Sequence, residues 1–94
     1  MEISQNQKEI IKEASRKFQP TMIGIFGSFA RGEQNESSDL DILIDFDETV
    51  NLLELIGLEQ ELSELLGMKV DLVTLKSVHP SLKPFIDSDL IRIL

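Results

Sequence analysis

Apolar side chains recur along the chain with two different periods, and these periods separate the predicted helices from the predicted strands. A spacing of three and four residues is typical of a helix with one buried face, whereas continuous or alternating apolar residues are typical of strands. The chain opens with a helical pattern, and a second helical pattern follows the middle of the sequence. Together the patterns predict helices over residues 4–18 and 51–66 and strands over residues 22–26, 39–46 and 69–75.

The ends of both predicted helices carry capping residues. Ser4 followed three residues later by Gln7 has the form of a capping box, and Gln19-Pro20 ends the first helical pattern. Asn51 begins the second helix, and Gly67, a residue type favoured at the C-cap, ends it. We expect the leucine stripe of this helix to close one face of a sheet; it consists of Leu55, Leu58, Leu62, Leu65 and Leu66.

The last part of the chain is less regular. Residues 77–80 are typical of a turn, and residues 81–86 have the pattern of a short helix. Residues 90–94 are apolar enough to dock on a sheet edge or to be covered by a partner, because an exposed apolar strand favours aggregation. With 94 residues, the chain is long enough for one α/β domain with its own core.

Acidic residues accompany the strand predicted over residues 39–46. Leu40, Ile42, Ile44 and Phe46 occupy one parity, whereas the acids share the other with Leu43 and therefore lie on one face. These acids are Asp39, Asp41, Asp45 and Asp47. Asp39 and Asp41, roughly 6.6 Å apart along that face, can both reach one metal ion or a pair of ions, whereas Asp45 lies roughly 13 Å beyond Asp41. Mg²⁺ prefers one or two carboxylates completed by phosphate oxygens and water, and this pair offers that number.

A bend-tolerant pair, Gly27-Ser28, follows the apolar strand over residues 22–26 and precedes residues that can begin a helical turn. Glycine lets an anion approach the backbone closely, and free N–H groups together with a serine hydroxyl can hold phosphate. A glycine–serine pair alone is more typical of an ordinary turn. Combined with Asp39 and Asp41, it indicates a nucleotidyl-transfer centre in which the β- and γ-phosphates lie at the bend.

The residues themselves leave two roles open. Asp71 lies within the apolar strand predicted over residues 69–75, where an unpaired buried acid costs several kcal/mol, so it either pairs with a lysine or has a chemical function. Arg31, four residues past Gly27, either helps to neutralise a triphosphate or forms a salt bridge with Glu33 or another acid.

The amino-acid composition indicates which kinds of molecule the protein can bind. The formal net charge is −8 and the chain contains no Trp, Tyr or Cys. Nucleic-acid binding relies on basic and aromatic side chains, so direct binding of nucleic acid is disfavoured and a basic protein partner is favoured. We find no apolar segment long enough to span a membrane and no signal-peptide pattern, and the lack of cysteine fits a reducing compartment. We therefore expect a soluble, cytoplasmic protein without a membrane partner.

The motifs resemble a known superfamily. Gly27-Ser28, a ten-residue interval and Asp39-Leu40-Asp41 resemble the defining pattern of the DNA polymerase β-like nucleotidyltransferases. The longer string Gly-Ser-Phe-Ala-Arg-Gly…Ser-Asp-Leu-Asp-Ile resembles the minimal branch, the MNT proteins that act as antitoxins to HEPN-domain toxins. The resemblance covers nearly the whole chain. It implies an α/β (α+β) fold like the polymerase β palm, with a small mixed sheet flanked by helices, as a single minimal nucleotidyltransferase domain over residues 1–94.

The resemblance also implies roles for particular residues. Asp39 and Asp41 match the two motif acids that bind Mg²⁺, and Gly27 and Ser28 match the pair that contacts phosphate. Asp71 matches the third acid, which deprotonates an attacking hydroxyl or ligates the catalytic metal.

By the same resemblance, the chain transfers AMP from MgATP to a tyrosine hydroxyl of a HEPN toxin and so acts as an antitoxin, in a hetero-oligomer with that toxin. The sequence contains no domain for binding an acceptor and no tyrosine of its own, so the acceptor must come from another protein. Two alternatives remain: a non-catalytic antitoxin that masks its toxin sterically, and a regulatory subunit that senses ATP without turnover.

Overall fold

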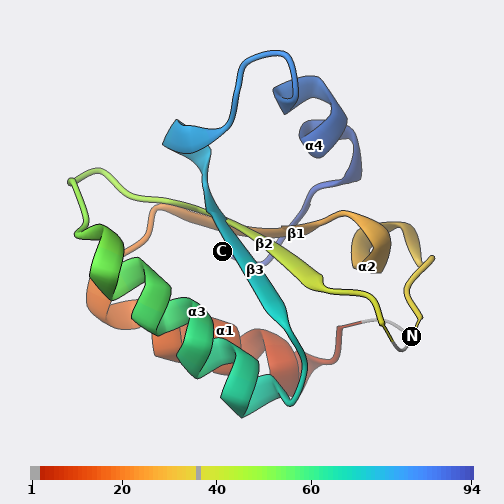
Figure 1. Ribbon diagram of the computed structural model, residues 1–94, viewed down its shortest axis with the longest axis horizontal. Helices are drawn as coiled ribbons and strands as arrows, with labels where there is room; N and C mark the ends of the chain where they lie inside the picture. The colour runs from red at the N-terminus through yellow and green to blue at the C-terminus, as the bar shows by residue number, and fades with distance from the viewer. Residues whose placement is uncertain (1–2, 36) are drawn as a thin grey trace.

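The computed structural model describes residues 3–35 and 37–94 and contains one four-stranded sheet with the strand order β3-β2-β1-β4. Helices and strands follow one another along the chain, as the sequence pattern predicts (Figure 1). Their bounds are α1 Gln5–Ser15, the 3₁₀ helix η1 Arg16–Phe18, β1 Met22–Phe26, α2 Ser28–Arg31, β2 Leu40–Asp45, α3 Leu52–Leu66, β3 Val70–Thr74, the 3₁₀ helix η2 Leu75–Ser77, α4 Lys83–Asp89 and β4 Ile91–Arg92.

The sheet is mixed. Strand β2 pairs antiparallel with β1 and parallel with β3, and α3 provides the connection that parallel neighbours require. Helices α1 and α3 lie side by side on one face of the sheet, and α4 lies on the other side (Figure 1). The predicted fold class, a small mixed sheet flanked by helices, is therefore confirmed.

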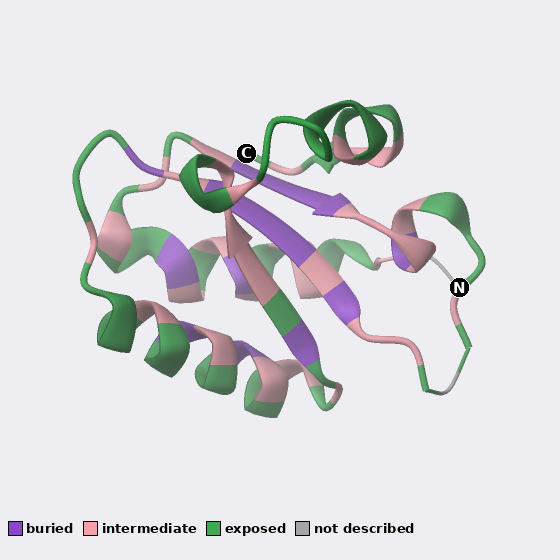
Figure 2. Cartoon of the chain, turned by 45° about the horizontal axis from the view of Figure 1, so that its top comes forward, coloured by how far each residue is buried: buried purple, intermediate pink, exposed green. Residues whose placement is uncertain are grey.

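The core lies between the sheet and the pair of helices α1 and α3 (Figure 2). The apolar parity of β2 faces these helices, and its three residues Leu40, Ile42 and Ile44 are fully buried. Each such side chain contributes about 1.5–3 kcal/mol on burial. The other members of the core cluster are Ile11, Ile23, Ile25, Phe29, Phe46, Leu58, Leu62 and Val70. Because the apolar parity is buried here, the acidic parity must face the opposite side of the sheet.

The predicted helix ends are largely confirmed. Ser4 and Gln7 form a complete capping box, in which the Ser4 hydroxyl accepts from the Gln7 amide at 3.1 Å and the Gln7 side chain accepts from the Ser4 amide at 2.8 Å. The Asn51 side chain caps α3 by accepting from the amide of Leu53, and Gly67 ends α3 with a φ of 66°.

One expectation for α3 is wrong, because Leu65 does not take part in the core. Its side chain is 55% exposed, whereas Leu58 and Leu62 of the same predicted stripe are buried. Leu66, the next residue of the same predicted stripe, is partly buried and packs against the core. Helical spacing alone does not show how far the covering surface extends.

The C-terminal segment docks on the sheet edge, as the sequence suggested. Strand β4 pairs antiparallel with β1, and the amide of Ile93 donates to the carbonyl of Ile23 at 2.9 Å. The preceding helix lies later than the expected residues 81–86, since α4 spans Lys83–Asp89. Pro84 explains the shift, because proline lacks an N–H and is tolerated only in the first turn of a helix.

The outer edge of β3 is covered by side chains of α3. The amide of Val70 donates to the Ser63 hydroxyl at 3.0 Å, and the amide of Leu72 donates to the Glu59 carboxylate at 2.8 Å. These are backbone groups that an edge strand would otherwise leave unpaired. Within the described residues, no helix has the length and apolar character needed to cross a membrane.

Ile42 provides a test of the core. We expect Ile42→Ala to lower the free energy of unfolding by about 2–5 kcal/mol, because the variant loses buried surface and leaves a cavity at the centre of the sheet. Leu53→Ala is the matched control, since Leu53 is 76% exposed and its loss should change stability by no more than about 0.5 kcal/mol. Urea denaturation of both variants measures the difference, and equal losses would contradict the assignment of the core.

Candidate active site

The candidate site begins at the bend between β1 and α2. Gly27 adopts φ 76° and ψ −153°, a backbone conformation that is essentially restricted to glycine. Ser28 follows as the first residue of α2 and is half-buried. Helix α2 extends only from Ser28 to Arg31, so its dipole is small and the site depends on the bend itself. The predicted bend at this pair is therefore present, and the helical turn expected after it is α2.

Asp41 lies directly against this bend. The register of the antiparallel strands pairs Asp41 with Phe26, the last residue before Gly27. A Cβ atom built on Gly27 would collide with the carboxylate oxygen Oδ2 of Asp41. Only glycine at position 27 leaves room for the Asp41 carboxylate. Glycine is therefore required here for two reasons, the backbone angles and this close contact.

Asp71 is the neighbour of Asp41 on the adjoining strand. Parallel pairing aligns the two residues directly, and side chains aligned in this way project from the same face of a sheet. Asp71 is exposed, because β3 is an edge strand, so the cost of burying an unpaired acid does not apply. No salt bridge to Asp71 occurs among residues 3–35 and 37–94, so the lysine pairing left open by the sequence is not formed.

The three aspartates influence one another electrostatically. Partial burial raises the pKa of Asp41, and the nearby charges of Asp71 and Asp39 raise it further, while Arg31 opposes the shift. Asp39 is also paired with Lys69, whose Nζ lies 3.6 Å from the Asp39 carboxylate. Asp41 is therefore the acid that most strongly experiences the crowding of negative charge.

The acids suit a divalent cation that is bound jointly with a phosphate ligand. Within the described ranges, no three acidic, histidine or cysteine residues are arranged to hold a metal ion by themselves. Mg²⁺ does not need such a cage, because it takes one or two carboxylates together with phosphate oxygens and water. Asp39 and Asp41, as oxygen donors on one face whose charges repel, fit this ligand set.

Arg31 joins two distant parts of the chain. Its guanidinium donates to Glu33 at 2.7 Å and to Asp89, the last residue of α4, also at 2.7 Å. A salt bridge with Glu33 or another acid was one of the two predicted alternatives, and the structure shows both contacts, with Asp89 as the acid that the sequence did not name. Arg31 and Asp89 are 58 positions apart in the sequence, and no local pattern indicates their pairing. These partners raise the pKa of Arg31, so it remains a cation beside Asp41.

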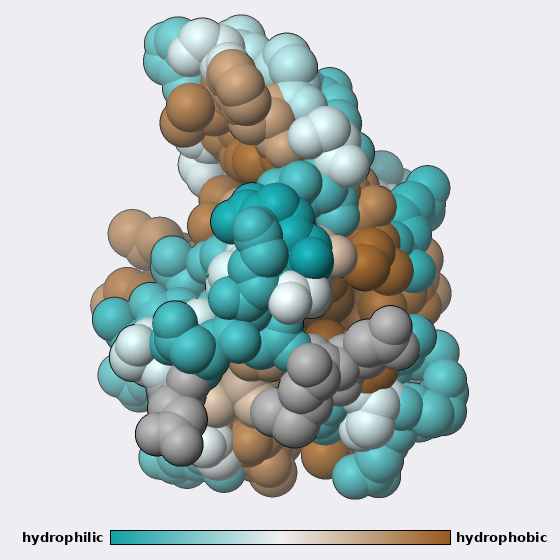
Figure 3. Space-filling model, turned by 90° about the vertical axis from the view of Figure 1, so that its right-hand side faces the viewer, coloured by the Kyte–Doolittle hydropathy of each residue, from teal (hydrophilic) through white to brown (hydrophobic). Residues whose placement is uncertain are grey.

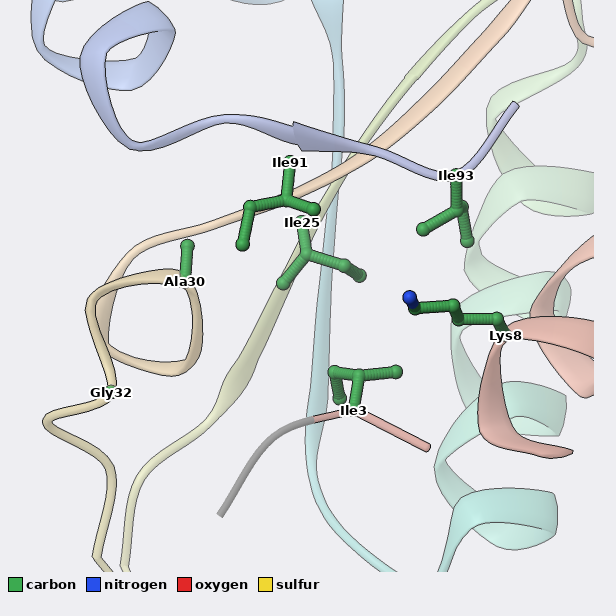
Figure 4. A pocket seen from close by; sticks show the side chains of 7 residues that line it. All are labelled: Ile3, Lys8, Ile25, Ala30, Gly32, Ile91 and Ile93. Atoms are coloured by element: carbon green, nitrogen blue, oxygen red, sulfur yellow. The ribbon is translucent and has the colours of Figure 1, made fainter. Parts of the chain in front are cut away.

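The surface around α2 is hydrophilic, and α4 above it carries an apolar cluster (Figure 3). A separate apolar cavity of about 250 Å³ lies behind α2, on the face of the sheet opposite Asp41 (Figure 4). Its walls are Ile3, Lys8, Ile25, Ala30, Gly32, Ile91 and Ile93. None of the predicted site residues lines this cavity, so it is not the candidate active site.

The mixed sheet, the glycine bend and the aligned acids together define a nucleotidyltransferase domain. Residues 7–93 match the nucleotidyltransferase domain family, and the chain belongs to that family.

Individual relatives refine the comparison. Over 93 residues the chain is 54% identical to "Putative protein adenylyltransferase MJ1217" of Methanocaldococcus jannaschii, covering 98% of this chain and 92% of that protein. It is 51% identical over 67 residues to the protein adenylyltransferase MntA of Thermococcus cleftensis, covering 71% of this chain and 68% of that protein. It also matches the crystal structure of a toxin–antitoxin with AMP-PNP at a TM-score of 0.83 and 28% identity, over 95% of this chain and 73% of that one.

The bend can be tested with a pair of glycine variants. We expect Gly27→Ala to destabilise the protein by about 1–3 kcal/mol for the backbone angle alone, with an additional loss because the new methyl group displaces the Asp41 carboxylate. Gly32→Ala is the control for a positive φ, since Gly32 lies in the αL region with φ 72° and ψ 23° and a Cβ there meets nothing within 4 Å. Thermal denaturation should show the larger loss of stability for Gly27→Ala, and an equal or smaller loss would contradict both the glycine-only backbone angles and the contact.

The raised pKa of Asp41 predicts how stability depends on pH. Above the ordinary value of 3.8, the folded protein retains a proton on Asp41 that the unfolded chain has released, so stability falls as the pH rises through this range. Asp41→Asn removes this loss, so without Mg²⁺ the variant should be at least as stable as the wild type at pH 7. Its advantage should shrink as the pH approaches 3. Urea denaturation across this range measures both effects, and a clear destabilisation at pH 7 would indicate a structural role.

Proposed function

We propose that this protein is a protein adenylyltransferase that transfers AMP from MgATP to a tyrosine hydroxyl of a HEPN-domain toxin and thereby acts as an antitoxin. The observation that carries the proposal is the contact between the Asp41 carboxylate and the Gly27 bend, with Asp71 aligned beside Asp41. Membership of the nucleotidyltransferase family and the 54% identity to a relative named as an adenylyltransferase support it.

Each site residue has a role in this reaction. The backbone at Gly27 and the hydroxyl of Ser28 hold the β- and γ-phosphates of ATP, and the glycine admits them close to the chain. Asp39 and Asp41 would hold Mg²⁺, and the bound ion would supply positive charge that neutralises the triphosphate and the departing pyrophosphate. Arg31 adds a fixed positive charge beside Asp41, while its salt bridges keep α2 in place.

Asp71 is the proposed proton acceptor. As the acceptor oxygen attacks the α-phosphorus, a new oxygen–phosphorus bond forms and the bond between the α-phosphorus and the bridging oxygen to the β-phosphate breaks. The hydroxyl proton passes to the Asp71 carboxylate and pyrophosphate leaves with the bonding electrons. The exposed position of Asp71 on an edge strand suits this role, since an acceptor hydroxyl can reach it from solvent.

The comparisons support the partner and the nucleotide. The similar crystal structure is a toxin–antitoxin with AMP-PNP, an ATP analogue, and the relative MntA is a protein adenylyltransferase. We further propose that residues 1–94 act as one catalytic domain in the cytoplasm, where ATP and a toxin are both accessible. The acceptor is a protein and not a nucleic acid, in keeping with the net charge of −8.

The test is to incubate the protein with MgATP and the HEPN-domain protein encoded in the same genome, and then to weigh that protein by mass spectrometry. One or more added AMP units, with release of an equal amount of pyrophosphate, would support the proposal. Neutralisation of the toxin with no change in mass would favour steric masking. Binding of ATP with neither transfer nor neutralisation would favour a regulatory subunit.

Variants of the acids separate their roles. Asp39→Asn and Asp41→Asn should each abolish transfer, whereas Asp71→Asn should lower kcat by about 10²–10⁴-fold with ATP binding retained. Asp45→Asn is the matched control, because Asp45 shares the strand face of Asp41 but lies roughly 13 Å from it. Full activity of Asp41→Asn, or equal loss in Asp45→Asn, would contradict the assignment.

A further inference from the structure

Helix α4 presents exposed apolar side chains beside the candidate active site. Leu82, which precedes the helix, is 54% exposed, and Phe85 within it is 71% exposed. An exposed phenylalanine offers a large contact area, about 150–250 Å² when it is fully buried. Figure 3 shows apolar side chains gathered on α4, directly above the hydrophilic surface of α2. The two surfaces are continuous at this end of the molecule.

Two contacts fix α4 on the acidic side of the sheet. Gly24 pairs with Leu43, so a side chain at position 24 would project from the same face as Asp41, which lies two residues before Leu43. Leu90, directly after α4, packs against Gly24 so closely that a Cβ there would collide with it. At the same helix end, Asp89 binds Arg31 at 2.7 Å. The apolar cluster therefore lies at the rim of the face that carries the acids.

The charge beside this rim disfavours a second copy of the chain. Within α4, Asp89 is paired with Arg31 and Lys83 offsets the charge of Asp87, so the negative charge comes from the aspartates of the candidate site on the same side of the sheet. Each copy carries a formal charge of −8, so two such faces would repel each other. A protein with an apolar contact surface surrounded by basic side chains is complementary to this rim.

We propose that Leu82 and Phe85 form the docking surface for the protein whose hydroxyl is modified. The inference rests on the proposed function, because it identifies where the acceptor of that reaction binds. The acceptor contacts α4 with an apolar patch, its basic residues face the acids, and its hydroxyl is thereby brought to the side of the sheet on which Asp41 and Asp71 lie. Docking by α4 supplies acceptor binding from within the nucleotidyltransferase domain.

The test uses the double variant Leu82→Ser/Phe85→Ser, whose changes affect only exposed side chains, with Leu53→Ser as the matched control. Leu53 is 76% exposed but belongs to α3, on the opposite face of the sheet. Binding of the HEPN-domain protein encoded in the same genome is measured by calorimetry in an Asp41→Asn background, so that affinity is independent of turnover. We expect Kd to rise by at least about tenfold in the double variant and to stay unchanged in the control.

Turnover measurements complete the test. In the catalytically intact background, KM for the acceptor should rise by a similar factor, while kcat and the affinity for ATP remain near the wild-type values. Unchanged acceptor binding in the double variant, an equal loss in Leu53→Ser, or a homodimer that dissociates only in the double variant would overturn the docking surface. A different outcome would be loss of binding in the double variant while the wild-type protein transfers no AMP to the bound HEPN-domain protein. That result would overturn the proposed function, but Leu82 and Phe85 would still be the surface that binds this partner.

Discussion

The pairing of β1 with β2 is the constraint on which the site depends. Its register places Asp41 opposite Phe26, and the chain then turns at Gly27 with backbone angles that only glycine readily adopts. The carboxylate occupies the space that a side chain at position 27 would fill. A shift of the register by one residue would turn Asp41 into the core and Ile42 to the surface, so the packing that holds the sheet together also holds the acid at the bend.

Much of the fold could be predicted because its signals are local. The parity of β2 identified its buried face, and the caps at Ser4 and Asn51 marked where helices begin. The errors arose where the outcome depends on distant parts of the chain. Leu65 follows the helical pattern of its neighbours but is 55% exposed, and the second acid that binds Arg31 could not be named because Asp89 lies 58 residues away. Such pairings are decided by how elements pack, which a linear pattern does not contain.

For the site, the structure brings together residues that the sequence predicted, Gly27, Asp41 and Asp71, but the physical reasons for their placement differ in part from those expected. Asp71 was expected to have either a partner or a chemical function because it interrupts an apolar strand, yet β3 is an edge strand and the side chain is exposed. The parallel register sets it beside Asp41. The helical turn predicted after Gly27 is present as α2, but it is too short to have a substantial dipole. Spacing in the sequence locates such groups, but only the pairing of the strands shows which of them are neighbours.

The coverage of β3 by Ser63 and Glu59 has a consequence for how the protein behaves at high concentration. A free strand edge is a template on which further chains can add, and continued addition leads to fibrils. Here two side chains of the protein's own helix occupy the amides that an incoming strand would need. At the β3 edge the amides of Val70 and Leu72 are therefore unavailable to an added strand, so the domain keeps an accessible acid on this outer strand while the edge is protected against strand addition.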